Sequence, residues 1–365
     1  MSGDQALDAE IVRISEAFRA AGAQVVDLPV LQPAETLLDL YGEDIRGRAY
    51  TTRDPLAGEL VLRPDFTVPV VQMHMASGAT PARYAYAGKV FRTQELDSDR
   101  PPEHDQVGYE LFDGSDPVAA DAEVFALFAE VLSGLHLRAA TGDIGVLMAA
   151  VRGLSAPDYR KAALVRHIWR PRRFRALLDR YSGRAPMPPG RMALLERFRR
   201  GDDVLAEAGP MIGLRGPEEI RERLAVLAAD AEQPPLSAAE TDLLDQIVTL
   251  RETAPMALER LRDIAVDMPA ITAAVARVEA RLEALAAKGL DVDALDFEGG
   301  YGRTSMEYYD GFVFGFYAAA RPDLPPVATG GRYDALTRAL GGGAEIPAVG
   351  GVIRPALVQA LREAG

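Results

Sequence analysis

The hydrophobic pattern changes from helical to alternating within the first third of the chain. Residues 1–22 carry apolar positions spaced 4, 3 and 4 apart, namely Leu7, Ile11, Ile14 and Phe18. This spacing predicts an amphipathic helix, which Gly22 can end. Residues 24–31 then have the pattern of a strand, and residues 34–41 predict a second, short helix.

Extended segments dominate the part of the chain that follows. They lie at 49–54, 59–63, 83–93 and 107–112. The first two are joined by Pro55-Leu56-Ala57-Gly58, whose proline and glycine are typical of a hairpin turn. Strands joined by hairpins or irregular loops favour an antiparallel sheet over the βαβ alternation of a parallel nucleotide-binding sheet.

The middle of the chain, residues 118–289, has an almost entirely helical pattern. Proline-rich interruptions at 186–189 and 234–235 indicate boundaries or linkers within it. Near its end, apolar residues repeat at spacings of 4, 3, 4 and 3, namely Ile271, Val275, Val278, Leu282 and Leu285. This narrow apolar stripe predicts a structural helix that packs against one other helix.

The extended pattern returns after residue 289. Extended segments are expected at 293–297, 308–317 and 327–329, and helices at 333–340 and 355–363. A sheet that resumes after a helical stretch predicts an α+β domain with an all-helical insertion. We therefore expect residues 1–150 and 266–365 to form the two parts of the α+β core, and residues 151–265 to form the insertion.

Composition narrows the class of protein and the chemistry available to it. The chain has 365 residues, of which 48% are hydrophobic and 26% charged, as in ordinary soluble globular proteins. It has no run of 18 apolar residues and its N-terminus does not have the pattern of a signal peptide, so we expect a cytoplasmic protein without a membrane partner. There are no cysteines, and the four histidines lie thirty or more residues apart. No metal or cofactor is therefore expected.

Charge is unevenly distributed along the chain. The formal net charge is −14, which disfavours a general nucleic-acid binder. Residues 152–200 nevertheless contain fourteen Lys or Arg and three acidic residues, a local charge of +11. This basic stretch is either a set of solvated helix faces or a docking surface for an acidic partner or for RNA.

Four segments of the predicted sheet domain hold polar residues that ordinary strands do not need. They are 62–67, 91–110, 306–311 and 329–334. Taken singly, each segment is typical of a turn, a helix cap or a half-buried aromatic pair. Taken together and in this order, they indicate a binding site.

These segments resemble the catalytic core of class II histidyl-tRNA synthetases, from about residue 10 to the C-terminus. The family's LRP-(E/D)-x-T segment, which holds the amino group of histidine, corresponds to Asp65 and Thr67. Four residues match the family's motif 2 at its spacing, namely Arg92, Arg100, Gln106 and Glu110. The resemblance implies that Arg92 and Arg100 are remnants of phosphate binding. It also implies that the segments with Tyr308, Tyr309 and Tyr333 line the histidine pocket.

The chemistry of these residues suits free histidine, which presents an ammonium, a carboxylate and an imidazole. Asp65 and Thr67 can accept hydrogen bonds from the ammonium. Gln106 and Glu110 lie four residues apart on one strand face, where they can reach the carboxylate end and the imidazole N–H respectively. The aromatic walls are expected to be Tyr309 and Tyr333.

Two departures from the synthetase pattern count against catalysis. Thr304 replaces an arginine that precedes the tyrosine pair in the family, and Leu357 replaces the arginine of motif 3 that holds the ATP triphosphate. A bidentate arginine contact to phosphate cannot be imitated by threonine or leucine. The chain also ends at Gly365, close to motif 3. We therefore expect no synthetase-type catalysis and no anticodon-binding domain.

A histidine pocket without the reaction resembles the regulatory subunit of ATP phosphoribosyltransferase, a synthetase-like paralogue in histidine biosynthesis. The resemblance implies activation of a short-form catalytic subunit, feedback inhibition by histidine as effector, and a hetero-octamer built on homodimers of this chain. It implies no tRNA. The alternatives are a true histidyl-tRNA synthetase catalytic domain and an RNA-binding derivative of the synthetase.

Overall fold

The chain divides into two compact units. The computed structural model describes residues 3–41, 49–94, 101–206, 208–210, 213, 215–303 and 308–364. The first unit combines residues 1–153 with 245–365, and the second unit is residues 154–244. The sequence interpretation extended the insertion to residue 265. In the structure, residues 251–253 pair with residues 296–298 of the large sheet, so this part of the helical stretch belongs to the first unit.

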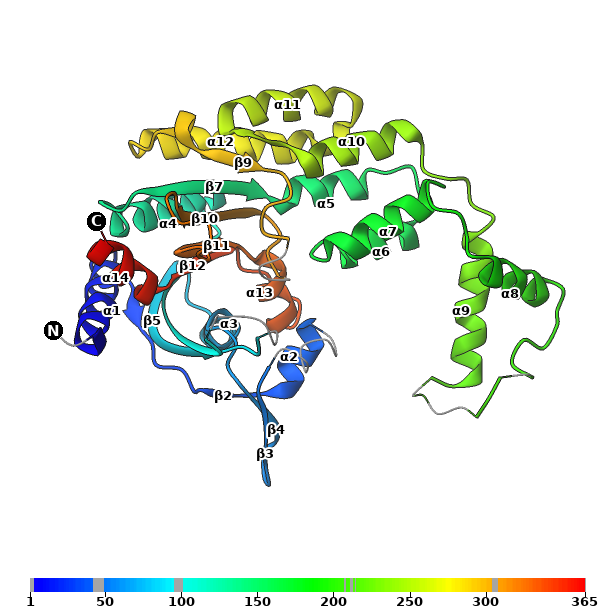
Figure 1. Cartoon of the computed structure of the whole chain (residues 1–365), viewed down its shortest axis with the longest axis horizontal. Helices are drawn as coiled ribbons and strands as arrows, with labels where there is room; N and C mark the ends of the chain where they lie inside the picture. Colours follow the sequence, from blue (N-terminus) through cyan, green and yellow to red (C-terminus); the bar gives the residue numbers. More distant parts are fainter. Residues whose placement is uncertain are drawn as a thin grey trace. The chain divides into compact units, whose positions relative to one another are not determined.

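The large sheet of the first unit contains nine strands among the described residues. They are β1 (Gln24–Val25), β5 (Ala82–Phe91), β6 (Glu103–Phe112), β7 (Leu137–Asp143), β8 (Arg251–Thr253), β9 (Asp296–Glu298), β10 (Phe312–Ala318), β11 (Ala328–Arg332) and β12 (Ala348–Ile353). Their order is β1-β5-β6-β12-β11-β10-β7-β9-β8 (Figure 1). Neighbouring strands are antiparallel except for β1–β5 and β7–β9. The predicted α+β architecture with an antiparallel sheet is confirmed.

A small second sheet lies beside the large one in the first unit. Its strands are β2 (Leu31–Pro33), β3 (Thr51–Asp54) and β4 (Gly58–Leu62), in the order β2-β4-β3. The predicted hairpin over 49–63 is confirmed as β3 and β4. The prediction of one strand over 24–31 is wrong, because its two ends pair with different partners: β1 with β5 and β2 with β4.

Helices of the first unit cover the large sheet in layers. They are α1 (Gly3–Ala20), α2 (Ala34–Tyr41), α3 (Thr67–Ser77), α4 (Pro117–Val131), α5 (Ile144–Arg152), α11 (Ala254–Asp267), α12 (Thr272–Ala287), α13 (Asp334–Leu340) and α14 (Pro355–Ala364). Helix α4 packs on β6, β11 and β12, and α12 packs in turn on α4 and α11. Helix α12 therefore contacts both α4 and α11, whereas its narrow apolar stripe predicted packing against one helix. Two phenylalanines of α4, Phe125 and Phe128, contact Phe314 of β10 with ring centroids 5.4 and 5.5 Å apart.

Three strands were not expected from the sequence. β7 and β8 lie inside the stretch 118–289 that was predicted to be almost entirely helical, and β12 was not predicted at all. β7 follows α4 after a short turn and leads directly into α5, so the helical signal on both sides hides it. β12 contains Gly350 and Gly351, which remove the alternation that identifies a strand.

The described residues of the second unit form helices and connecting loops, with no strand among them. Its helices are α6 (Asp158–Arg166), α7 (Pro171–Tyr181), α8 (Pro189–Arg199) and α9 (Pro217–Asp230), and α10 (Ala238–Thr249) begins in it. Leu195 of α8 packs with Leu224 and Ala228 of α9 to form a small apolar core. Arg160 donates to the Asp230 carboxylate at 2.5 Å and to the Pro234 carbonyl at 2.8 Å, which fixes α6 to the end of α9.

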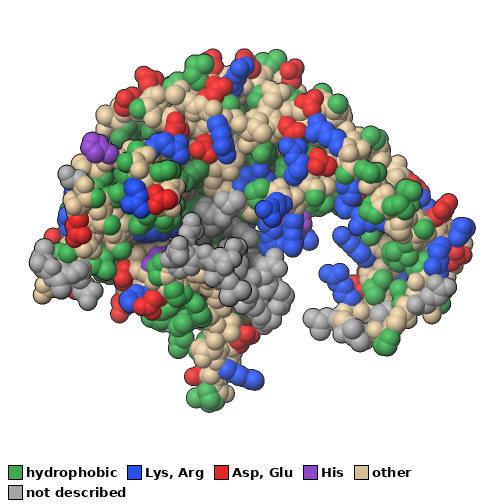
Figure 2. Space-filling view, viewed as in Figure 1, with side chains coloured by type: hydrophobic (Ala, Val, Ile, Leu, Met, Phe, Trp, Pro, Cys, Tyr) green, Lys and Arg blue, Asp and Glu red, His purple; other side chains and the backbone are tan. Residues whose placement is uncertain are grey.

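Much of the basic stretch 152–200 lies at the surface of the second unit. Figure 2 shows Lys and Arg side chains gathered on the visible face of this unit. Some of them are paired, as Arg184 is with Asp242 at 2.6 Å. Arg172 and Arg173 of α7 are exposed and make no ion pair with any described residue. The stretch is therefore partly a set of paired helix faces and partly an open cationic surface.

Candidate functional site

Several polar side chains of the first unit gather around one carboxylate, that of Glu110 on β6. Glu110 is completely buried. Its strand partner on β12 is Gly350, and a Cβ at this glycine would collide with the Glu110 carboxylate. Two residues earlier on the same face, a Cβ at Gly108 would collide with the ring of Tyr86 on β5. These two glycines provide the space in which Glu110 and Tyr86 meet.

Three hydroxyl groups donate hydrogen bonds to the Glu110 carboxylate. Thr67 Oγ1 and Tyr86 Oη donate to Oε1 at 2.9 and 2.8 Å. Tyr333 Oη donates to Oε2 at 2.6 Å. A carboxylate has about four acceptor positions, so one remains for a ligand.

Burial dominates the electrostatics of this carboxyl group. It raises the pKa of Glu110 to about 7, against the opposing effect of the three hydroxyl donors. Burial also raises the pKa values of Tyr86 and Tyr333 well above the usual value of tyrosine, with the Glu110 charge acting in the same direction. Both phenols therefore keep their protons at neutral pH and act as donors to Glu110.

Two further buried acceptors among the sequence-predicted pocket residues have no hydrogen-bond partner among the described residues. They are Oδ2 of Asp65 and Oε1 of Gln106. Gln106 lies on the same face of β6 as Glu110, and its Nε2 contacts Nε2 of His104 at 3.3 Å. Burial raises the pKa of Asp65, against the lowering effect of Arg92. Buried acceptors without donors are costly, so their presence indicates a place for a donor-bearing ligand.

Aromatic rings lie next to these polar groups. Tyr308 lies edge-on to Tyr309 and to Tyr333, with centroids 5.1 and 6.0 Å apart. Phe66 stacks on Tyr86 at 4.4 Å. We call this set the Glu110 pocket: Asp65, Thr67, Tyr86, Gln106, Glu110, Tyr308, Tyr309 and Tyr333. The structure thus brings six of the seven sequence-predicted pocket residues together with Tyr86, whereas Gln106 lies four residues from Glu110 on the same strand and contacts His104.

The residues expected to be remnants of phosphate binding are described only in part. Arg92 Nε donates to the Pro64 carbonyl at 2.8 Å. Its charge, together with burial and the charge of Arg354, lowers the pKa of His104 to about 4. Arg100 and Thr304 lie outside the described residues, and Leu357 lies on α14. Arg92 is thus the one predicted phosphate ligand whose surroundings are known.

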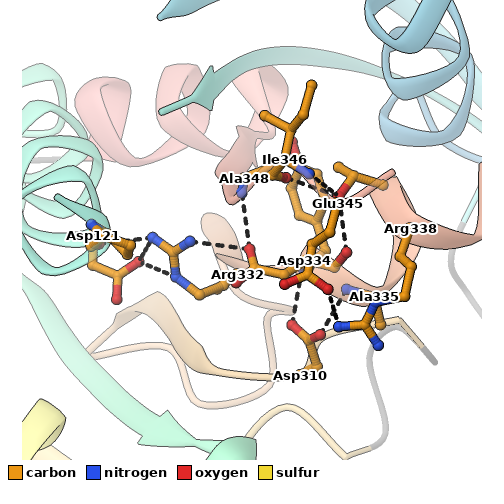
Figure 3. A network of polar contacts seen from close by, with 12 residues as sticks. Asp121, Asp310, Arg332, Asp334, Ala335, Arg338, Glu345, Ile346 and Ala348 are labelled. Atoms are coloured by element: carbon orange, nitrogen blue, oxygen red, sulfur yellow. Dashed lines mark hydrogen bonds and ion pairs between the residues drawn. The ribbon is translucent and has the colours of Figure 1, made fainter. Parts of the chain in front are cut away.

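A buried polar network adjoins the pocket on the side of Tyr333 (Figure 3). Arg332 makes two hydrogen bonds to Oδ1 of Asp121, at 2.9 and 2.6 Å, and one to Asp334 at 3.0 Å. Arg281 joins the network from α12 by donating to Asp121 and to Asp143, each at 2.9 Å. We call Asp121, Asp143, Arg281 and Arg332 the arginine cluster. It secures the strand that leads into Tyr333.

Sequence reasoning missed Tyr86 and gave Asp310 no role. The signal for Tyr86 was present, because Tyr84, Tyr86 and Gly88 alternate on one strand opposite the segment that carries Glu110. What was missing was the register, which places Tyr86 opposite Gly108 and so directs its hydroxyl diagonally to Glu110. Asp310 follows the tyrosine pair, and only the fold reveals its contacts with residues 334 and 335.

The described part of the chain contains neither a candidate metal cluster nor a candidate membrane span. No group of three or more His, Asp or Glu side chains there is arranged to hold a metal ion. None of the helices there combines the length and the apolar character that a membrane span requires.

Comparisons with known proteins agree on one family. A family model described as histidyl-tRNA synthetase matches residues 6–234 and 221–356. Among curated proteins, the chain is similar to the "ATP phosphoribosyltransferase regulatory subunit" of Brucella ovis and to that of Brucella abortus. Each is 32% identical over 360 residues, which cover 94% of this chain and 94% of the relative.

Solved structures support the same fold. One from Bacillus halodurans C is described as an ATP phosphoribosyltransferase regulatory subunit/histidyl-tRNA synthetase, and it covers 98% of this chain and 79% of its own, with a TM-score of 0.69 and 23% identity. A histidine–tRNA ligase subunit from Alicyclobacillus acidocaldarius covers 99% and 94%, with a TM-score of 0.58 and 24% identity. The predicted class II synthetase-like fold is confirmed.

Proposed function

Because this chain belongs to the family of ATP phosphoribosyltransferase regulatory subunits, we propose that it binds histidine in the Glu110 pocket and thereby regulates a catalytic partner. The partner is a short-form ATP phosphoribosyltransferase subunit, which this chain activates and through which histidine exerts feedback inhibition. The assembly is a hetero-octamer that contains homodimers of this chain, and its location is the cytoplasm. The names of the relatives support a regulatory role, and the pocket supports the choice of effector.

One observation carries the choice of histidine: the pocket is rich in buried acceptors that lack donors. Asp65 Oδ2 and Gln106 Oε1 have no partner in the described structure, and Glu110 has one acceptor position left. A ligand must therefore bring several N–H groups into an aromatic enclosure. Histidine does so with an ammonium and an imidazole N–H.

The orientation of Gln106 refines the role proposed for this side chain. With Nε2 directed to His104, the side chain offers its oxygen to the pocket, which suits the ligand's ammonium rather than its carboxylate. Asp65 and Gln106 then hold the ammonium together. Arg92, close enough to Asp65 to lower its pKa, is the cation proposed for the carboxylate.

We propose that the chain itself has no synthetase activity. Motif 3 supplies Leu357, an aliphatic residue of α14, where the family has an arginine for the triphosphate. The family model keeps a second candidate open, a histidyl-tRNA synthetase catalytic domain. Histidine-dependent ATP–pyrophosphate exchange separates the two, because it requires activation of the amino acid. Exchange by the purified chain at a synthetase-like rate would favour the second candidate.

The direct test combines binding with regulation. Histidine is titrated calorimetrically into the purified chain, with histidinol and imidazolepropionate as controls that lack the carboxylate and the ammonium respectively. The short catalytic subunit is then assayed alone, with this chain, and with this chain and histidine. We expect histidine to bind more tightly than both controls, the chain to activate the partner, and histidine to inhibit the complex. Absence of both binding and activation would contradict the proposal.

A further inference from the structure

Tyr333 is held from both sides by a buried set of backbone contacts. Its amide donates to the Ala348 carbonyl on β12 at 3.0 Å. The Ala348 amide donates in turn to Oδ1 of Asp334, the next residue in the chain, at 2.8 Å. The backbone around Tyr333 is therefore tied to the strand whose Gly350 faces Glu110.

Asp310 completes this arrangement from a different segment of the chain. Its Oδ1 accepts a hydrogen bond from the Asp334 amide at 3.0 Å, and its Oδ2 accepts one from the Ala335 amide at 2.7 Å (Figure 3). The Asp310 amide donates to the Arg332 carbonyl at 3.0 Å. Asp310 thus binds the backbone immediately before and immediately after Tyr333.

Helix α13 depends on this external side chain for its first turn. Tyr333 stands at the N-cap position and makes no capping hydrogen bond with its side chain. The first amides of a helix need acceptors, and a carboxylate is the strongest acceptor that a protein offers there. Asp310 supplies both acceptors, so the N-cap residue keeps its own side chain for another contact, the hydrogen bond to Glu110.

We propose that Asp310 is a positioning residue for the Glu110 pocket. By fixing the backbone of residues 332–335, Asp310 holds the Tyr333 hydroxyl on Glu110. The proposal rests on the proposed function for its ligand. Asp310 acts through Tyr333 and does not itself touch histidine. Loss of its carboxylate frees the start of α13, so the phenol of Tyr333 moves away from Glu110.

Several charged groups face Asp310 and set its response to pH. They are Asp334 of α13, Arg332 of β11, Asp121 of α4 behind Arg332, and Asp143 and Arg277 beside Gly145 near the Asp310 carbonyl. Burial, followed by the Asp334 charge, raises the pKa of Asp310 to about 7, against the two amide donors and Arg332. A protonated Asp310 has an O–H where an amide needs an acceptor. Its hydrogen bonds to the Asp334 and Ala335 amides are therefore weakened as the pH falls through this range.

The first test is a double-mutant cycle on histidine affinity in the full chain. We expect Asp310→Asn and Tyr333→Phe each to weaken binding about tenfold, and the double variant to bind like Tyr333→Phe within about twofold, because the two residues act in series. Losses that multiply to about a hundredfold, or wild-type affinity of Asp310→Asn, would overturn the proposal. Asp323→Asn, an exposed carboxylate paired with Arg321, is the matched control and should leave affinity unchanged.

The second test compares wild type and Asp310→Asn as a function of pH. The ratio of their histidine affinities should be about ten at pH 8 and approach one near pH 5.5, because wild-type Asp310 is then protonated. Titration of histidine itself cancels in this ratio. A ratio that stays near one from pH 5.5 to 8 would exclude a positioning role for the carboxylate.

The third test needs no ligand, so it separates this proposal from the proposed function. A crystal structure of ligand-free Asp310→Asn should show the Tyr333 hydroxyl beyond hydrogen-bond distance of Glu110, compared with 2.6 Å in the wild type. Asp310→Ser, which keeps one short acceptor for the Asp334 amide, is the milder variant if Asp310→Asn does not fold. Retention of the hydrogen bond between Tyr333 and Glu110 in the variant would overturn the positioning role of Asp310. Absence of histidine binding by the wild type would instead contradict the proposed function.

Discussion

The arginine cluster and the Glu110 pocket are two buried polar regions of the same unit, and they treat carboxylates in opposite ways. In the arginine cluster both oxygens of Asp121 accept from guanidinium groups, and Asp143 accepts from Arg281. In the pocket, Glu110 accepts only from hydroxyls, and no described Lys or Arg donates a hydrogen bond to Glu110 or Asp65.

The difference indicates where the protein has left room for a cation. A buried carboxylate with a guanidinium partner has its charge compensated within the fold. A buried carboxylate without one has a raised pKa, as Glu110 and Asp65 have. The carboxylates of the arginine cluster have guanidinium partners within the fold, although Oδ1 of Asp143 accepts no hydrogen bond, whereas Glu110 and Asp65 have no guanidinium hydrogen-bond partner among the described residues.

The largest effect is expected from breaking the arginine cluster. Arg281→Ala leaves Asp121 with one guanidinium partner and Asp143 with none, which should lower the free energy of unfolding by about 3 to 5 kcal/mol. Urea unfolding measures this change. Arg277→Ala, an exposed arginine on the same helix, should cost less than about 0.5 kcal/mol. Equal effects of the two substitutions would show that the cluster contributes little to stability.

A smaller effect, on binding rather than stability, is expected from the pocket. Glu110→Gln and Asp65→Asn should each weaken histidine binding by about 1 to 3 kcal/mol, because a neutral amide replaces an ionised acceptor and can present its donor end. Calorimetric titration gives the affinity and an inhibition curve of the complex gives the response. The control is Glu103→Gln, an exposed glutamate of the same strand that pairs with Lys89. Wild-type affinity in both pocket variants would place the histidine site elsewhere.

The pH dependence of stability should distinguish the unoccupied pocket from the occupied one. Burial raises the pKa of Glu110 from 4.5 in the unfolded chain to about 7, so the folded state binds more protons between these values. The free energy of unfolding therefore falls as pH rises from about 4.5 to 7, by about 3 kcal/mol for this group, because one pKa unit corresponds to about 1.4 kcal/mol. Saturating histidine should flatten the fall, because a cationic ligand favours the carboxylate. A stability profile of wild type that matches that of Glu110→Gln would refute this assignment.

The smallest effect on the chain itself is expected at the basic stretch. Arg172→Ala combined with Arg173→Ala should change stability by less than about 0.5 kcal/mol and leave histidine binding unaltered, since both side chains are exposed. If the stretch docks the catalytic partner, the double variant should weaken assembly more at low than at high salt. Sedimentation of the complex at two ionic strengths measures this. Arg221→Ala, in the same unit and paired with Glu218, is the control.

The elements that could be predicted from the sequence are those that depend on local residue patterns. The amphipathic period of α1 and the turn residues of the β3–β4 hairpin predicted these elements close to their observed bounds. The spacing of Gln106 and Glu110 placed both on one face of a strand, as observed. These features depend on residues within a few positions of one another, so a single sequence contains them.

The unpredicted part depends on pairings between distant segments. The contact of Tyr86 with Glu110 follows from the register of β5 against β6, and the contact of Asp310 with residue 335 joins the segment before β10 to the start of α13. β12 escaped prediction because its glycines leave no side-chain pattern to recognise. Such features are fixed by the packing of the whole sheet, which no local window of sequence describes.

The bare backbone opposite Glu110 and Tyr86 has a consequence for how feedback control could be lost. Gly108 and Gly350 have no side chain. A methyl group at Gly108 would displace Tyr86, and a methyl group at Gly350 would displace Glu110. Alanine at either position would occupy the space that the Tyr86 or Glu110 side chain fills. If histidine is the effector, as proposed, we expect Gly108→Ala or Gly350→Ala to yield a subunit that no longer responds to histidine.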